Sequence, residues 1–197
     1  MTRRAKPAIC LMLGWVALLW LLEGLDVATG NALDSFGIQP RDPAELVDVV
    51  PAAFLHFGFG HLGANTLPLL LLGFVAALRS GVRRFLAVVL LIILASGLGV
   101  WLTAPPQSNT AGASGVVFGL FGYLVVRGFI DRKLLDIGIG VVVAAVYGSI
   151  VWGALPTDSG ISWQGHLFGL LGGVLAAFAF KERSRPVPAG ATVRQVP

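Results

Sequence analysis

The side chains of this sequence that could carry out chemistry are a serine, three histidines and an asparagine, all in apolar surroundings. Ser114 stands in the stretch NTAGASGVVFG, where a polar, turn-rich loop gives way to a long apolar run. His56, His61 and Asn65 share the stretch LHFGFGHLGAN, and His166 stands in SWQGHLFGLLGG. A serine becomes nucleophilic when a base lies within hydrogen-bond reach. The set therefore indicates nucleophilic catalysis by Ser114, with His166 as a candidate base.

Attack by Ser114 on a carbonyl would create an oxyanion, which needs hydrogen-bond donors already in place. A helix that begins at Ser114, just after Gly112, leaves unpaired backbone N–H groups at that point. Asn65 follows His61 by four residues, so both side chains face the same side of a helix. Its amide and the ring N–H of His61 are therefore candidate donors.

Other chemistries fit this set less well. His56 and His61 are five residues apart, which does not place them on one helix face, and no H-E-x-x-H motif or neighbouring carboxylate completes a metal site. No Gly-rich loop ending in Gly-Lys-Ser/Thr is present for phosphate binding. The hydrolase motif G-x-S-x-G fails at Val116. We expect neither a metal nor another cofactor.

The composition predicts the elements that must position these residues. Of the 197 residues 56% are hydrophobic and 12% charged, with a mean hydropathy of +0.83; soluble domains average about 25% charged residues. We therefore expect an all-α polytopic membrane protein with one domain. Cys10 is the one cysteine and forms no internal disulfide. Six apolar segments are near the length that spans a bilayer, namely 8–27, 57–78, 85–103, 114–130, 134–155 and 162–180.

The charges that flank these segments predict their orientation. With the N-terminus inside, only Arg41 of the 14 basic residues falls in an outer loop. We expect residues 1–7 to be a cytoplasmic N-terminus, 8–181 to form a six-span domain in the cell membrane, and 182–197 to be a disordered cytoplasmic tail. A signal peptide at the first segment is disfavoured because no small-residue cleavage site follows it. In the first outer loop, 45–54 is expected to form a short interfacial helix.

This topology gathers the polar residues near one face of the membrane. Each of them alone has a simpler explanation, because serine can bond back to its own helix, histidine can lie at the interface, and asparagine can join helices. Their gathering in one leaflet favours a site, since polar groups at such depths are costly without a function or a partner.

At these residues the sequence resembles the rhomboid intramembrane serine proteases. The resemblance covers residues 37–181 and rests on three pieces in the expected order. HFGFGHLGAN is similar to the family's His–His–Asn pattern on the second span, and GASG to its G-x-S-G at the head of the fourth. GHLFGLLGG is similar to its histidine followed by G-x-x-x-G on the sixth.

The resemblance implies a role for each residue. Ser114 would be the nucleophile and His166 the general base, without an aspartate. Asn65, His61 and the N–H of Ser114 would form the oxyanion hole, beside Gly112. The remaining positions would be supporting ones: Phe118 under the His166 imidazole, where the family often has tyrosine, and Gly169 and Gly173 for packing of span six on span four. His56 is offset by five residues from His61 and so points elsewhere on a helix or lies in the loop before it, and we expect it to have a structural role, bonding loop backbone. The sequence departs from many rhomboids in lacking a Trp-Arg pair in the first outer loop, where its one arginine is Arg41.

The implied activity is a serine endopeptidase that cleaves transmembrane segments of membrane proteins near the outer face through an acyl-enzyme. A substrate helix would enter near spans two and five, where Phe59, Trp152 and Trp163 line the entrance or anchor the protein at the interface. The expected partners are transmembrane substrates and the lipid bilayer, with no nucleic acid. Two alternatives stay open. One is an inactive rhomboid-like protein that binds membrane helices; the other is a small transporter, which the one-sided clustering and the lack of an internal repeat disfavour.

Overall fold

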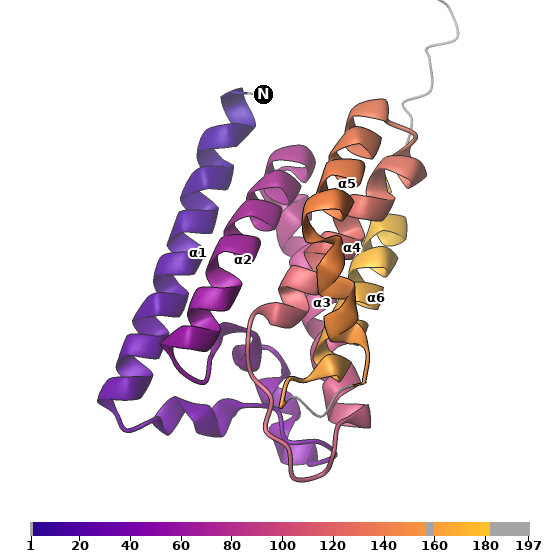
Figure 1. Ribbon diagram of the computed structural model, residues 1–197. Helices are drawn as coiled ribbons and strands as arrows, with labels where there is room; N and C mark the ends of the chain where they lie inside the picture. The colour runs from indigo at the N-terminus through magenta and orange to yellow at the C-terminus, as the bar shows by residue number, and fades with distance from the viewer. Residues whose placement is uncertain (1, 157–159, 182–197) are drawn as a thin grey trace, which may run out of the picture.

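The computed structural model describes residues 2–156 and 160–181, and these are helices joined by loops (Figure 1). The six α-helices are α1 (Thr2–Ala28), α2 (Phe59–Ser80), α3 (Val82–Thr103), α4 (Ser114–Asp131), α5 (Leu134–Tyr147) and α6 (Trp163–Ala179). Four 3-10 helices lie between them: η1 (Ala32–Phe36), η2 (Pro43–Val49), η3 (Pro51–Phe54) and η4 (Gly148–Ala154). The predicted all-α class is confirmed.

Five of the helical segments are long and apolar enough to cross a membrane. They are Arg3–Ala28, Phe59–Ser80, Val82–Thr103, Ser114–Asp131 and Leu134–Ala154, the last being α5 continued by η4. The sixth, α6, is apolar but has 17 residues, about 25 Å of helix, which is short against a hydrocarbon core of about 30 Å. The number of spans in the bilayer therefore stays a prediction.

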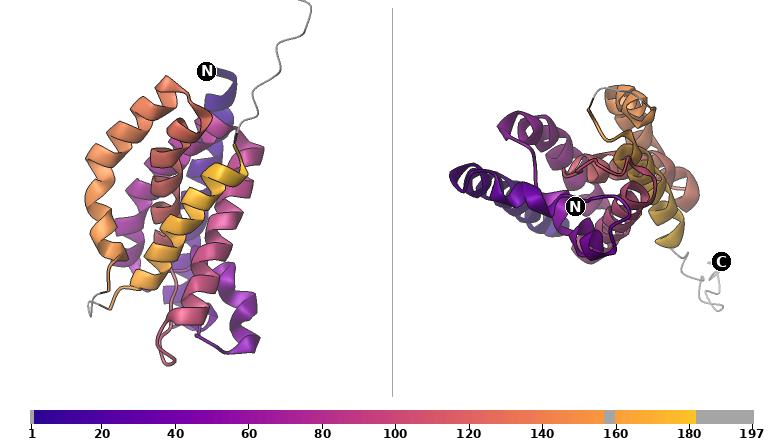
Figure 2. Two further views of the ribbon diagram at one scale, coloured as in Figure 1. Left: turned by 90° about the vertical axis from the view of Figure 1, so that its right-hand side faces the viewer. Right: turned by 90° about the horizontal axis from the view of Figure 1, so that it is seen from below.

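Helix α4 occupies the centre of the bundle, and 67% of its residues 114–131 are buried inside the protein. It packs against α6, α5, α2 and α3, while α1 lies at the edge against α2 (Figures 1 and 2). Helices α2 and α5 both pack on α4, but they have at most slight contact with each other. Helices α2 and α5 therefore each pack on α4 without packing closely on each other.

Glycines permit the close approach of α4 and α6. A Cβ atom added to Gly169 would collide with the backbone oxygen of Gly115, and one added to Gly173 would collide with that of Gly119. Small residues at such an interface let two helix backbones meet in the membrane. The pairing fixes the depth and rotation of α6 relative to the start of α4.

The two ends of the bundle differ in character (Figure 1). One end, called the loop end below, carries η1 to η3, the segment 104–113 and the start of α6; it is the lower end in Figure 1. The segment 104–113 turns back from this end into the bundle before α4 begins. A short antiparallel bridge between Ile38 and Thr110 ties it to the first loop. The opposite end, called the basic end, holds the N-terminus and the α2–α3 and α4–α5 turns.

Several boundaries differ from the predicted ones. The helix expected over 45–54 is divided into η2 and η3, because Pro51 has no N–H to continue the first turn into the second. Helix α1 begins at Thr2, before the predicted start of the first span at Ala8; the cytoplasmic location of residues 1–7 stays a prediction. The expected span 134–155 is an α-helix only to Tyr147 and then tightens into η4. The predicted disordered tail, 182–197, lies outside the described residues.

Candidate active site

A cavity of about 910 Å³ opens near the loop end, between α2, α4, α6 and the segments around them. Its walls include six of the predicted site residues: His61, Asn65, Gly112, Ser114, Phe118 and His166. Side chains from three helices far apart in the sequence thus face one space. His56, predicted to have a supporting role, is not among the residues that line it.

Ser114 is the first residue of α4 and is partly exposed to this cavity. The first N–H groups of a helix have no partner within the helix, so the backbone here offers donors to a ligand. Gly112 has φ 136°, a conformation that glycine adopts readily. A Cβ atom at Gly112 would lie 2.8 Å from Cε1 of His61 and 3.8 Å from Oγ of Ser114. Gly112 therefore leaves the space that the two side chains share.

The ring of His166 is held on two sides. Its Nδ1 lies 2.9 Å from the carbonyl oxygen of Gly153, in η4. Because a carbonyl only accepts hydrogen bonds, Nδ1 carries the proton, and Nε2 of the neutral ring is left as an acceptor. The ring also stacks on Phe118, with centroids 4.0 Å apart and planes 10° apart. The imidazole thus has the tautomer and the fixed orientation that a general base requires.

Ser114 and His166 face the same cavity, but among the described residues no hydrogen bond joins the serine Oγ to the imidazole. Hydrogen bonds between catalytic groups are often long in an unliganded site and tighten when substrate binds. The two elements that carry the pair are already fixed against each other, since Gly115 of α4 lies against Gly169 of α6. A hydrogen bond of 2.8 Å from Ser96 Oγ to the Gly165 carbonyl also fastens α6 to α3 next to His166.

His61 has a tautomer suited to donation. The backbone N–H of Phe57 donates to His61 Nδ1 over 3.4 Å, so the proton of the neutral ring resides on Nε2. That nitrogen lies on the side of Gly112, since a Cβ atom there would be 3.0 Å from it. His61 therefore presents an N–H donor toward the turn that carries Ser114.

Asn65 is buried at the cavity wall and donates one hydrogen bond within its own helix. Its Nδ2 donates to the backbone oxygen of His61 over 3.1 Å. An amide nitrogen carries two hydrogens, so one N–H remains for a ligand. The bond also fixes the direction of the amide relative to His61.

His56 lies in the loop before α2, with 2% of its surface exposed, and bonds to the backbone that leads into α4. Its Nε2 accepts a hydrogen bond of 3.3 Å from the N–H of Ala113, the residue before Ser114. Burial, with the neighbouring His61 ring as a second cause, lowers the pKa of His56 to about 4. His56 is therefore neutral near pH 7, as its acceptor role requires.

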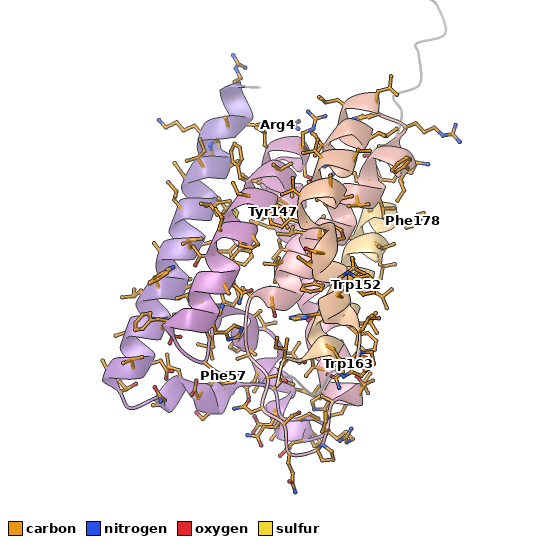
Figure 3. All side chains as sticks on the ribbon, viewed as in Figure 1. Arg4, Phe57, Tyr147, Trp152, Trp163 and Phe178 are labelled. Carbon is orange, nitrogen blue, oxygen red and sulfur yellow. The ribbon has the colours of Figure 1, made fainter. Side chains whose placement is uncertain are left out.

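The aromatic residues expected at the entrance occupy different positions. Trp163 lines the cavity, whereas Trp152 in η4 is 71% exposed (Figure 3). Phe59 is exposed and stacks on Trp20 of α1, with ring centroids 5.8 Å apart.

One group that contributes to the candidate site could not be predicted from residue types. It is the backbone oxygen of Gly153, whose position depends on the tightening of α5 into η4. Over the residues that the structure describes, no group of three or more His, Cys, Asp or Glu side chains is arranged to hold a metal ion.

Comparison with known proteins agrees with this geometry. The family model for the rhomboid domain matches residues 43–183, which include η2, η3, α2 to α6 and every residue of the candidate site. The chain belongs to the rhomboid family. Helix α1 and η1 lie outside the matched segment.

The relatives of this rhomboid protein cover most of its length. An uncharacterized protein of Mycobacterium tuberculosis is 43% identical over 182 residues, which are 88% of this chain and 75% of the relative. The putative rhomboid protease YdcA of Bacillus subtilis is 29% identical over 185 residues, 89% of each chain. Rhomboid protease GluP of the same organism is 35% identical over 127 residues, 64% of this chain and 24% of that protein.

Proposed function

We propose that this rhomboid protein is an intramembrane serine endopeptidase with Ser114 as nucleophile and His166 as general base. The observation that carries the proposal is the state of His166. Its Nδ1–H is bound to the Gly153 carbonyl and its ring rests on Phe118, so Nε2 is the free acceptor in the cavity that Ser114 also lines. A histidine with a purely structural role would not need a free acceptor nitrogen next to an accessible serine hydroxyl.

The reaction follows from the roles of these groups. His166 Nε2 takes the proton of the Ser114 hydroxyl as Oγ attacks the scissile carbonyl carbon. The resulting oxyanion accepts hydrogen bonds from the N–H of Ser114, from His61 Nε2–H and from the second N–H of Asn65. The C–N bond breaks as His166 returns the proton to the leaving amine, and an acyl-enzyme on Ser114 remains. Water, deprotonated by His166, attacks the acyl carbon and releases Ser114 with its proton restored.

The substrate class is the transmembrane segment of another protein. Helices α2 and α5 flank the cavity and have at most slight contact with each other, which supports sideways entry between them. A segment must unwind there, because a helix keeps its carbonyls in internal hydrogen bonds. The relatives called rhomboid proteases support the same reaction class.

The proposed placement in the cell membrane has six spans, with both termini in the cytoplasm and the site near the outer face. Its support is the distribution of charge. The arginines of the turns, such as Arg79 and Arg127, lie at the end opposite the cavity, as expected for the cytoplasmic side.

Labelling by a fluorophosphonate probe tests the activated serine. We expect the detergent-solubilised protein to react with the probe, and the Ser114→Ala variant not to react. His166→Ala should react far more slowly, since the hydroxyl has lost its base. A protein that stays unlabelled while correctly folded would favour the alternative, a rhomboid-like protein that binds membrane helices without cutting them.

A further inference from the structure

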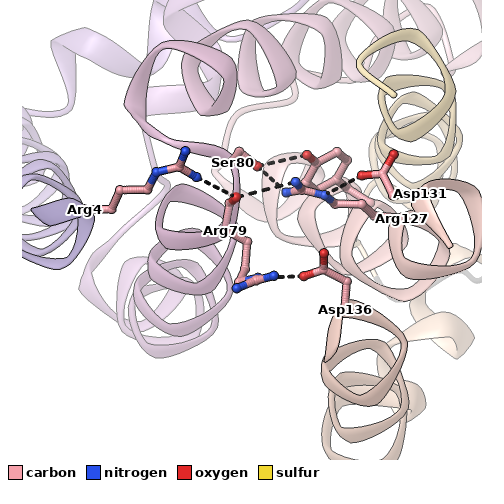
Figure 4. Close-up of polar contacts among 7 residues, drawn as sticks. Arg4, Arg79, Ser80, Arg127, Asp131 and Asp136 are labelled. Carbon is pink, nitrogen blue, oxygen red and sulfur yellow. Dashed lines mark hydrogen bonds and ion pairs between the residues drawn. The ribbon is translucent and has the colours of Figure 1, made fainter. Parts of the chain in front are cut away.

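A second hollow lies at the basic end, far from the candidate active site. Its volume is about 260 Å³, and its walls are formed by Arg3 and Arg4 of α1 and by Leu78 and Arg79 of α2. It is thus built by the first turn of one helix and the last turn of another, and three of its four wall residues are arginines. Arg4 points from α1 across to α2 in Figures 3 and 4.

Protein contacts hold two of these arginines in place (Figure 4). Arg4 Nη1 donates to the backbone oxygen of Arg79 over 3.2 Å. That carbonyl belongs to the last turn of α2, whose carbonyls have no partner within the helix. The side chain of Arg79 is turned toward α5, where its Nε bonds to Asp136 Oδ1 over 2.6 Å. Two of the three arginines of the hollow are therefore held by bonds to the protein.

Two of the three arginines around the hollow have no acidic partner among the described residues. Within residues 2–156 and 160–181, neither Arg3 nor Arg4 forms an ion pair with an acidic side chain. The two carboxylates in Figure 4 already have partners, since Asp131 pairs with Arg127 and Asp136 with Arg79. Two guanidinium groups, those of Arg3 and Arg4, thus border one hollow without a counter-charge from the described residues. An anion with several acceptor oxygens is the complementary ligand.

The location of the hollow indicates which anion it is. It is formed by the first turn of α1 and the last turn of α2, at one end of two helices apolar enough to span a membrane, so in the proposed six-span placement it would face lipid headgroups. Further along the same helices, large apolar side chains are exposed, among them Ile9, Leu13 and Leu71. A phospholipid would present its phosphate to the arginines while its acyl chains lie along this apolar surface. Basic pockets between membrane helices bind anionic headgroups in this way.

We propose that the Arg3–Arg4–Arg79 hollow is a binding site for the phosphate of an anionic phospholipid. The bound lipid would bridge α1 to α2 at the basic end. The site shares no residue with the Ser114 cavity, so it does not depend on the proposed proteolysis.

Native mass spectrometry of the full chain in detergent tests the proposal, with phosphatidylglycerol and phosphatidylcholine as probes. Wild type should retain phosphatidylglycerol at least roughly tenfold more strongly than phosphatidylcholine. Arg4→Gln should remove most of this preference, because a charged donor to phosphate is lost. Lys6→Gln is the matched control, since it removes one exposed charge from the same helix outside the hollow. It should cost only the few-fold effect of diffuse surface charge.

Further arms keep the outcome decisive. Arg3 makes no hydrogen bond to protein among the described residues, so Arg3→Gln reports on the ligand even if Arg4→Gln fails to fold. Ser114→Ala should bind phosphatidylglycerol as wild type does, which separates this site from the proposed activity. Equal losses in Arg3→Gln and Lys6→Gln would overturn the proposal. If millimolar inorganic phosphate displaces bound phosphatidylglycerol as effectively as added phosphatidylglycerol does, the hollow binds a free anion. That result would overturn the proposal of a lipid site.

Discussion

At the scale of single residues, some groups of the candidate site can be predicted from the sequence and others cannot. Ser114, His61, Asn65 and His166 could be selected from residue type, spacing and surroundings. The acceptor for His166 Nδ1 could not, because it is the backbone oxygen of Gly153. Any residue carries such an oxygen, and only the 3-10 geometry of η4 brings this one to the imidazole. In the proposed dyad, a main-chain carbonyl would orient the histidine as a carboxylate does in a Ser-His-Asp triad.

Replacement of Gly153 tests this orienting contact. A Cβ atom there would lie 3.1 Å from Cζ of Phe118 and 3.3 Å from Nδ1 of His166, so Gly153→Ala must displace the imidazole by a few tenths of an ångström. We expect kcat on a transmembrane substrate to fall roughly tenfold to a hundredfold, with little change in KM, because small misplacement of a base is costly. Gly148→Ala is the control, since nothing lies within 4 Å of a Cβ at this position of the same 3-10 helix. Unchanged kcat in Gly153→Ala would remove Gly153 from the site.

The pKa of His56 predicts how stability depends on pH. The folded protein holds the pKa at about 4 against 6.5 for a free histidine, so the unfolded chain binds the proton more readily. Stability from this group is therefore complete above pH 6.5 and is lost as the pH falls toward 4, by about 3 kcal/mol in all. Thermal unfolding in detergent at a series of pH values measures the loss. His56→Gln does not titrate, and its stability should decline less steeply; parallel curves would contradict the role given to His56.

At the scale of elements, the helices could be predicted well, and their ends and joints less well. Apolar length and flanking charge located every α-helix, and the start of α4 at Ser114 agrees with the prediction. The tightening of α5 into η4 was missed, because its apolar composition continues unbroken from Leu134 to Ala154. Helix period and hydropathy do not distinguish α from 3-10 turns. That distinction decides the position of Gly153, and therefore part of the site.

The close packing of α4 and α6 predicts that alanine at two different glycines has different effects on thermal stability. Gly169→Ala must push α6 away from the Gly115 backbone, so thermal stability should fall by roughly 1–3 kcal/mol, and cleavage should fall with it. Gly138→Ala lies in α5 with nothing within 4 Å of its Cβ, and alanine is the better helix former. It should leave stability equal or higher. If the two variants unfold at the same temperature, the close contact between Gly169 and Gly115 does not contribute to stability.

At the scale of the whole molecule, the proposed activity depends on how the bundle sits in the membrane. Basic residues gather at one end and the candidate site near the other. Reporter fusions after Ser80 and Arg132 should therefore read cytoplasmic, and a fusion after Gln107 should read external. The opposite result at any of these three positions would break the six-span arrangement, whatever the chemistry of the site.

The central claim is that Ser114 and His166 act together to hydrolyse a peptide bond within the membrane. Cleavage of a transmembrane substrate by the protein reconstituted in lipid vesicles tests it most directly. Wild type should cut the substrate, and Ser114→Ala and His166→Ala should each lose cleavage while unfolding near the wild-type temperature. The double variant should be no worse than either single one, because the two residues act as a unit. Substantial cleavage by the folded Ser114→Ala variant would contradict the account.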